Sequence, residues 1–292
     1  MGAHLRLLRV LVVAGLLASA MAGCAKPIRH TDVSADAQVV ADRMTTGAVM
    51  QMASARLTQP IPNRILQPGH LEGRTLTVAT TADIVLRPGE VILTFDDGPR
   101  AGKTPAILDA LDQYGVKATF LMLGSAAKAN PALARQVAQH GHTVGSHTYN
   151  HVDLGKLSRQ AALDEIARGE AAVAEALGNE DLSPFFRFPY LSQTGYLRTT
   201  LLQGDMVVLD VDIDSKDYYS DSVAVVTART LDRLEARGSG IILFHDIHQR
   251  TVDMLPGFLA ELEERGYSVV RLVPKSSGIF GRSVITAELG GQ

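Results

Sequence analysis

The amino-acid sequence predicts an α/β fold of about seven β-then-α units, whose parallel strands form a closed or nearly closed barrel. The first observation is that, from residue 89 onward, short apolar and β-branched runs alternate with longer segments of helical periodicity. The second is that a glycine follows five of the expected helices, as is typical of helix C-terminal caps. These glycines are Gly115, Gly141, Gly178, Gly238 and Gly266.

The expected elements follow from this alternation. Strands are expected at residues 91–95, 118–123, 143–145, 185–188, 206–211, 240–244 and 268–272. Helices are expected at residues 104–114, 131–139, 158–177, 196–202, 222–236 and 252–265. Ser158 precedes apolar residues at helical spacing and predicts a capped helix start, while Pro131 suits a first helical turn.

Composition excludes several classes of protein. A hydrophobic share of 46% over 292 residues is too high for a wholly disordered chain. A net charge of −3 provides no basic surface for phosphate backbones, so we expect no binding of nucleic acid. The single cysteine permits neither an internal disulfide nor a zinc site built from thiolates.

Residues 1–23 have the pattern of an export signal. Arg6 and Arg9 precede an apolar run at residues 10–20, which is too short to span a bilayer comfortably. The sequence Met-Ala-Gly-Cys that ends at Cys24 resembles a bacterial lipobox, so we expect Cys24 to be the lipidated first residue of the mature chain. The alternative is an ordinary signal peptide that is cut nearby, with Cys24 incidental.

Three further segments are expected after this signal. Residues 24–88 read as an N-terminal tether and a small strap, with one amphipathic helix over residues 36–56. Residues 89–273 form the main domain, and the glycine- and serine-rich residues 274–292 form a peripheral tail.

Ionisable residues follow five of the expected strands. They are Asp96 and Asp97 after the first strand, His147 and His151 after the third, Arg187 in residues 187–190 after the fourth, Asp210, Asp212, Asp214 and Asp217 after the fifth, and His245 and Asp246 after the sixth. In parallel α/β barrels the mouth at the C-terminal ends of the strands holds the chemistry. The sequence therefore predicts a site at this mouth.

Two histidines and a carboxylate form a candidate metal site. Neutral imidazoles are normal zinc ligands, and Asp97 with His147 and His151 gives three protein ligands and leaves one position for water. Asp96 would then remain as a base beside that water. The alternatives are that residues 96–99 form a plain turn and that the two histidines are polar loop residues, since their spacing alone is weak support.

Two further residues have a functional and a structural interpretation. His245 follows an apolar strand and is either a core histidine or a general acid oriented by a carboxylate, with His248 as the spare candidate. Arg187 is either a surface residue or the partner of a carboxylate. Pro189 fixes the backbone in a way that allows the amide of Tyr190 to point into the site.

Four motifs in order resemble those of the NodB-type polysaccharide deacetylases, carbohydrate esterase family four. The resemblance spans residues 89–272. Its first motif is Thr-Phe-Asp-Asp-Gly-Pro at 94–99, its second is Ser-His-Thr-Tyr-Asn-His at 146–151, its third is Arg-Phe-Pro-Tyr at 187–190, and its fifth is Leu-Phe-His at 243–245.

This chain departs from the family pattern at two places. The fourth motif is usually Asp followed by Trp, and the nearest match here is Asp217 followed by Tyr218, with Asp214 as a competing alignment. The residue after the third motif is often small in the family, whereas here it is Leu191.

The resemblance implies a distorted (β/α) barrel and a divalent metal, zinc before other ions, held by Asp97, His147 and His151. It implies Asp96 as the base and His245 as the acid. The remaining implied roles concern residues around these groups: Arg187 would orient Asp96, Asp217 would tune His245, and Leu243 would help to line the pocket for the acetyl methyl group.

The expected function is removal of N-acetyl groups from a glucosamine-containing polysaccharide, with release of acetate. The expected substrates are peptidoglycan, poly-N-acetylglucosamine or a chitin-like oligomer. Two alternatives stay open: an O-acetyl esterase acting on a polysaccharide, and a non-catalytic glycan-binding lipoprotein. We expect a monomer in the cell envelope, anchored on the periplasmic side of a membrane by the lipid on Cys24.

Overall fold

A computed structural model describes residues 71–178 and 182–275. The chain divides into two units, Met1–Ile61 and Pro62–Gln292, and the described residues all lie in the second. The expected signal segment, Cys24, the helix over residues 36–56 and most of the C-terminal tail lie outside the described residues. No helix in the described part of the chain is long and apolar enough to cross a membrane.

The described residues form a nine-stranded sheet in which every pairing is parallel. The strands are β1 (Glu72–Val78), β2 (Glu90–Asp96), β3 (Thr119–Met122), β4 (Thr143–Ser146), β5 (Phe185–Phe186), β6 (Val207–Val208), β7 (Ile213–Asp214), β8 (Gly240–His245) and β9 (Ser268–Pro274). This agrees with the predicted parallel α/β architecture.

Strand β2 lies at the centre of the pairing. On one side it pairs with β3, and the order continues through β4 and β5 to β6. On the other side it pairs with β8, which pairs with β7, while β9 joins the start of β2 to β1. The register places Asp96 beside His245 at the C-terminal ends of β2 and β8, so two candidate site residues are neighbours across the sheet.

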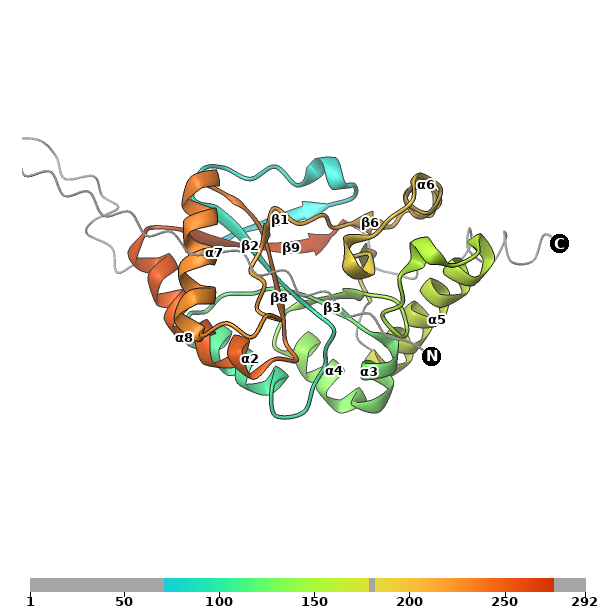
Figure 1. Ribbon diagram of the computed structural model, residues 1–292, viewed down its shortest axis with the longest axis horizontal. Helices are drawn as coiled ribbons and strands as arrows, with labels where there is room; N and C mark the ends of the chain where they lie inside the picture. The colour runs from blue at the N-terminus through green and yellow to red at the C-terminus, as the bar shows by residue number, and fades with distance from the viewer. Residues whose placement is uncertain (1–70, 179–181, 276–292) are drawn as a thin grey trace, which may run out of the picture. The chain divides into compact units, whose positions relative to one another are not determined.

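Helices lie to the left of, below and to the right of the strands in Figure 1. They are α2 (Thr104–Gln113), α3 (Gly124–Ala129), α4 (Pro131–Gln139), α5 (Arg159–Leu177), α6 (Gly195–Gln203), α7 (Val223–Arg237) and α8 (Gln249–Glu264), with short 3-10 segments η2 (Thr81–Asp83), η3 (Leu154–Lys156) and η4 (Pro189–Leu191). The capped start at Ser158 is confirmed, because its side chain accepts a hydrogen bond from the Ala161 amide.

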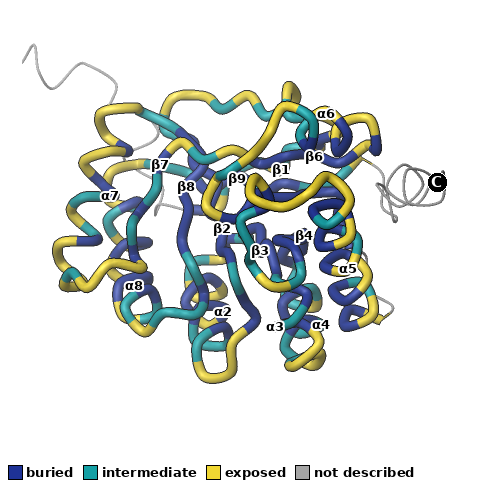
Figure 2. Tube along the Cα trace, turned by 45° about the vertical axis from the view of Figure 1, so that its right-hand side comes forward, coloured by how far each residue is buried: buried dark blue, intermediate teal, exposed yellow. Residues whose placement is uncertain are grey.

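The apolar side chains of the strands pack on both faces of the sheet, and Figure 2 shows the central strands largely buried. On the face covered by helices, Phe95 stacks on Phe120 and Phe244, with ring centroids 5.0 and 5.7 Å apart. On the other face, a smaller cluster joins β1 and β9 to the inner sides of β2, β5 and β8. A strand buried on both faces reads as a continuous apolar run, which is why these strands were recognisable in the sequence.

The five predicted glycine caps are confirmed, since each of these residues has a positive φ between 64° and 81°. Three elements were not predicted: β1, α3 and β7. Strand β1 lies within the stretch that the sequence assigned to a strap, and it pairs with β9. The strand predicted at residues 206–211 is wrong in its length, because β6 covers only two residues and the chain then turns to begin β7.

Candidate active site

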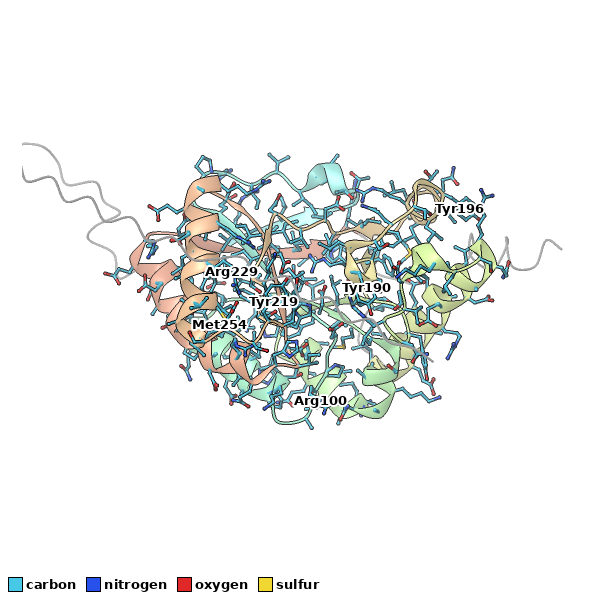
Figure 3. The ribbon with its side chains drawn as sticks, in the orientation of Figure 1. Arg100, Tyr190, Tyr196, Tyr219, Arg229 and Met254 are labelled. Atoms are coloured by element: carbon cyan, nitrogen blue, oxygen red, sulfur yellow. The ribbon has the colours of Figure 1, made fainter. Side chains whose placement is uncertain are left out.

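A cavity of about 400 Å³ opens at the C-terminal ends of the strands. It is lined by Asp96, Asp97, His147, His151, Phe188, Tyr190, Leu191, Asp214, Tyr218, Leu243, His245 and His248. Residues predicted from four separate motifs therefore meet in one place. Figure 3 shows Tyr190 and Tyr219, which come from different loops, near the middle of the view.

Asp97, His147 and His151 form a cluster in which one ligand atom from each residue lies within 4.8 Å of the others. The Nε2 atoms of both histidines are 3.6 Å from Oδ1 of Asp97. Two atoms bound about 2.1 Å from one tetrahedral zinc ion lie about 3.4 Å apart, so these separations suit ligands around a shared cation.

The chemistry of the three side chains also fits a divalent metal. Oδ1 of Asp97 is buried and has no hydrogen-bond partner among the described residues. Nδ1 of His147 donates to the carbonyl oxygen of Arg187 at 2.7 Å, which leaves the lone pair of Nε2 facing the cluster. Burial lowers the pKa of His151, which favours the neutral imidazole that binds a metal.

The loop that carries the two histidines is fixed by neighbouring helices. Thr148 and His151 have positive φ values of 70° and 59°. Residues other than glycine adopt such backbone angles only when the surrounding structure enforces them. The carbonyl oxygen of Thr148 accepts from the Gly124 amide at 2.8 Å. On the other side, Gly169 of α5 lies so close that an added Cβ atom would be 2.4 Å from the Thr148 carbonyl carbon.

Asp96 lies beside this cluster and is held by a buried arginine. Nη1 of Arg187 donates to Oδ1 of Asp96 at 2.8 Å, and Arg187 is 1% exposed. The same nitrogen donates to Thr94 Oγ1, and Nε donates to the carbonyl oxygen of Leu209. The other carboxylate oxygen of Asp96 is 3.8 Å from Nε2 of His147, and Asp96 is one of the residues that line the cavity.

His245 is paired with Asp217 rather than with Asp214. Nδ1 of His245 lies 2.7 Å from Oδ1 of Asp217, and the His245 amide donates to Oδ2 of Asp217 at 2.8 Å. Thr251 also donates to Oδ2 of Asp217, at 2.6 Å. Burial raises the pKa of Asp217, but the hydrogen bonds and charge of these partners outweigh it and leave that pKa below its usual value.

The pKa of His245 is raised to about 9. Burial alone lowers it, but the hydrogen bond to Asp217 and the negative charges of Asp217, Asp96 and Asp97 outweigh the loss of solvation. This shift favours the protonated imidazole, and Nε2 is the ring nitrogen that does not contact Asp217.

Asp214 lines the cavity and accepts a hydrogen bond from the Tyr218 hydroxyl at 3.0 Å. The Tyr218 ring packs edge-on against His245, with centroids 5.4 Å apart. Burial, together with the charge of Asp214, raises the pKa of Tyr218 to about 12. Tyr218 thus forms one wall of the cavity, with its hydroxyl protonated.

The other side of the cavity is formed by the third motif. Tyr190 packs edge-on against His151, with ring centroids 4.5 Å apart, yet its side chain is 66% exposed. Leu191 stands beside it, exposed at the rim, while Leu243 at the end of β8 is buried in the cavity wall. Leu191, where the family often has a small residue, therefore contributes to the lining of the cavity.

Two of the acids expected at the mouth lie elsewhere. Asp212 precedes β7 and contacts Arg237 and the Ile241 amide, at the opposite end of the sheet. Asp210 pairs with Arg198 at 2.8 Å. The sequence placed them wrongly because it treated residues 206–211 as one strand, whereas β6 is short and β7 begins a new one.

Sequence analysis missed residues that hold the loop around Asp217. Nε and Nη2 of Arg229 donate to the carbonyl oxygen of Ser215 at 3.1 and 3.0 Å, and Arg250 donates to the carbonyl oxygen of Asp217 at 2.8 Å. Both arginines come from helices, so a search confined to strand ends does not find them.

The role of Asp246 was also missed. Its carboxylate is buried beside Gly98, accepts a hydrogen bond from Thr104, and has a pKa that burial raises to about 7. Its position directly after His245 was visible in the sequence, but its contact with the first motif was not.

Comparison with known proteins agrees with this geometry. A profile described as polysaccharide deacetylase matches residues 85–209. A peptidoglycan-N-acetylglucosamine deacetylase of Listeria monocytogenes is 33% identical over 62% of this chain and 38% of its own length. A chitin deacetylase of Colletotrichum lindemuthianum is 34% identical over 68% of this chain and 84% of its own length.

A solved structure of a peptidoglycan deacetylase is similar to this chain in fold and in sequence. The peptidoglycan deacetylase of Bdellovibrio bacteriovorus superposes with a TM-score of 0.63 and 35% identity, covering 75% of this chain and 61% of the other. The fold is that of a parallel α/β protein, and the chain belongs to the polysaccharide deacetylase family. It spans only 38% of the length of the Listeria relative.

Proposed function

We propose that this protein removes N-acetyl groups from a glucosamine-containing polysaccharide and releases acetate. The observation that carries the proposal is the meeting of three groups in one cavity: the Asp97, His147 and His151 cluster, the carboxylate of Asp96, and the imidazole of His245 that is paired with Asp217. A non-catalytic glycan-binding protein needs neither a base nor an acid next to such a cluster.

Asp97, His147 and His151 would hold a divalent metal, zinc before other ions. When bound there, the metal would polarise the acetyl carbonyl and make water at the open position more acidic. Asp96 accepts the proton of the attacking water, and the contact from Arg187 holds its carboxylate in place beside the cavity.

The remaining residues complete the reaction. Attack on the carbonyl carbon forms a carbon–oxygen bond, and the amide of Tyr190 stabilises the negative oxygen that develops. His245 then donates its proton to the amine nitrogen as the carbon–nitrogen bond breaks, and acetate leaves. Leu243 lines the position of the acetyl methyl group. Water and the N-acetyl sugar are thus converted to acetate and a free amino sugar.

The substrate class follows from the relatives, which are named for peptidoglycan N-acetylglucosamine and for chitin. Both polymers contain N-acetylglucosamine, and the cavity joins a polar centre to apolar and aromatic walls that suit a sugar ring. Amide cleavage is favoured over ester cleavage because an amine leaving group needs the protonated acid that His245 supplies.

The test is acetate release from a panel of N- and O-acetylated glycans. The protein loaded with zinc should release acetate from N-acetylated strands. The His245→Ala variant should keep its metal, but its turnover should be lower than that of the wild type by a factor of about 10²–10⁴. His140→Ala is the matched control, since His140 pairs with Asp112 away from the cavity. Release from O-acetylated glycans alone would make the protein an esterase.

We also propose that the protein acts in the cell envelope as an exported lipoprotein, with its lipid on Cys24. The support is that the only cysteine of the chain directly follows small residues at the end of an apolar run. Cys24→Ser should move the protein from the membrane fraction to the soluble fraction; unchanged partitioning and processing would show the anchor to be elsewhere.

A further inference from the structure

A second cavity, of about 410 Å³, lies on the other side of the candidate metal ligands. Asp97 and His151 line both cavities, so the second cavity adjoins the point where the acetyl group would be cleaved. The second cavity is lined by Asp97, Pro99, Arg100, Leu123, Ser125, Ala126, Ala129, Asn130, His151 and Ile247. The proposed reaction uses none of these residues except the two metal ligands.

The lining of the second cavity contains one cation and one carboxylate. Arg100 is its cation, it is exposed, and within the described residues its guanidinium has no hydrogen-bond or ion-pair partner. Asp97 is the only carboxylate in the lining, and it faces the metal cluster. The remaining lining combines the polar side chains of Ser125 and Asn130 with small apolar ones. An amphipathic ring that carries a negative group fits this combination.

The backbone of Arg100 is held in place by Thr104 and Asp246. Its amide donates to Thr104 Oγ1 at 2.7 Å, and that hydroxyl donates in turn to the buried carboxylate of Asp246. The carboxylate of Asp246 also packs against Gly98, leaving no room for a Cβ atom there. The segment from Gly98 to Thr104 is therefore anchored, and Figure 3 shows Arg100 toward the lower edge of the view, apart from Tyr190 and Tyr219.

We propose that this second cavity binds the sugar next to the one being deacetylated, and that Arg100 pairs with a carboxylate on that sugar. The inference rests on the proposed function, since a polymer cleaved at the metal cluster must continue past it. In peptidoglycan, every second sugar carries a lactyl ether with a carboxylate, whereas chitin is neutral throughout. The preferred substrate class is thus an N-acetylglucosamine polymer that alternates with a carboxylate-bearing sugar.

The test uses two substrates that differ only in this charge. One is peptidoglycan glycan strands freed of their peptides, and the other is the same strands with each lactyl carboxylate converted to the neutral amide. Calorimetry measures Kd for both, and acetate release measures kcat/KM. The zinc-loaded protein should prefer the acidic strands by about five- to tenfold, as expected for one charge-assisted pair at an exposed position.

Variants assign the preference to Arg100. Arg100→Gln should bring the ratio between the two strands close to one, and Arg100→Lys should retain part of it, because a lysine keeps the charge but loses the planar fork. Lys128→Gln is the matched control: Lys128 is an exposed cation at the end of α3, outside the lining, and its loss should leave the ratio at the wild-type value.

Two outcomes would overturn the inference: equal Kd for the two strands in the wild-type protein, or a preference that survives in Arg100→Gln. Failure of the proposed function has a different signature, namely no acetate from any glycan. In that case the ratio of the Kd values for the acidic and the amidated strands still decides whether Arg100 binds the carboxylate.

Discussion

At the scale of single residues, the pairing of His245 with Asp217 determines when the proposed acid carries its proton. His245 contacts Asp217 through both its ring and its amide, and the raised pKa of about 9 results from this partner and from Asp96 and Asp97. Because the acid must be protonated, activity should be retained at neutral pH and should fall as the pH rises through about 9.

Replacing the partner should move this alkaline limb. Asp217→Asn keeps the shape of the side chain but removes the charge that raises the pKa of His245, so that pKa falls toward its ordinary value of 6.5. The alkaline limb of kcat/KM should move to lower pH by about one to three units. Asp253→Asn, an exposed position on α8, is the control and should leave the profile in place. An unshifted limb in Asp217→Asn would separate His245 from proton donation.

Asp96 gives a second prediction at the residue scale. Asp96→Asn preserves the contact surface offered to Arg187 but removes the basic carboxylate, so turnover should fall by about 10²–10⁴. The bound metal, measured by elemental analysis, should stay near the wild-type level because three other side chains form the cluster. A variant that keeps its turnover, or that loses its metal, would contradict the assignment of Asp96 as the base.

The sequence predicted the site residues that lie next to strand ends. It did not predict the residues that contact the site from helices. Asp96, His147 and His245 each lie within two residues of the end of an expected strand, so the sequence alone placed them at one mouth. Thr251 and Arg229 contact the Asp217 loop from helices α8 and α7. Their roles depend on tertiary contacts that have no periodic pattern in the sequence.

At the scale of elements, α5 acts as the support of the histidine loop. Its Gly169 meets the backbone of Thr148, and its Glu165 accepts a hydrogen bond from the Asn150 amide. The left-handed residues Thr148 and His151 lie on either side of that amide. A helix that approaches this closely fixes the distance between the two imidazoles more rigidly than the loop alone would.

Gly169→Ala should therefore affect the metal cluster as well as the stability. The new methyl group would overlap the Thr148 carbonyl, so the helix or the loop must move. We expect a loss of about 1–3 kcal/mol in the free energy of unfolding, together with weaker zinc binding measured by titration. Gly257→Ala in α8 is the matched control, because its Cβ meets nothing within 4 Å, and it should stabilise the helix by about 0.5–1 kcal/mol.

If Gly169→Ala binds zinc as tightly as the wild type, the loop does not depend on α5 for its geometry. The helix itself was predicted from its capped start and periodicity, but its tight contact was not. The same limit explains α3 and β7, which are too short to show a helical or strand period of their own.

At the scale of the whole domain, the parallel arrangement brings together residues that are far apart in the chain. Asp97 follows β2, the two histidines follow β4, and His245 ends β8, yet all line one cavity. Since parallel strands end on the same side, this gathering follows from topology alone. Strand β1 escaped prediction because most of its residues are polar or glycine and do not alternate with apolar ones over most of its length, and its pairing with β9 identifies it as part of the sheet.

A ligand that binds only the folded domain must also stabilise it, which gives the last prediction. The three metal ligands come from two loops, so an unfolded chain does not hold them together, and metal binding shifts the unfolding equilibrium. At a free zinc concentration 100 times its Kd, the stabilisation is about 2.7 kcal/mol. For a domain of this size that corresponds to a rise in Tm of about 5–10 °C, which thermal unfolding with zinc and with a chelator would measure. His151→Ala should lose most of this rise, while His140→Ala, away from the cluster, should retain it. An equal rise in His151→Ala would mean that zinc stabilises the protein somewhere other than at this site.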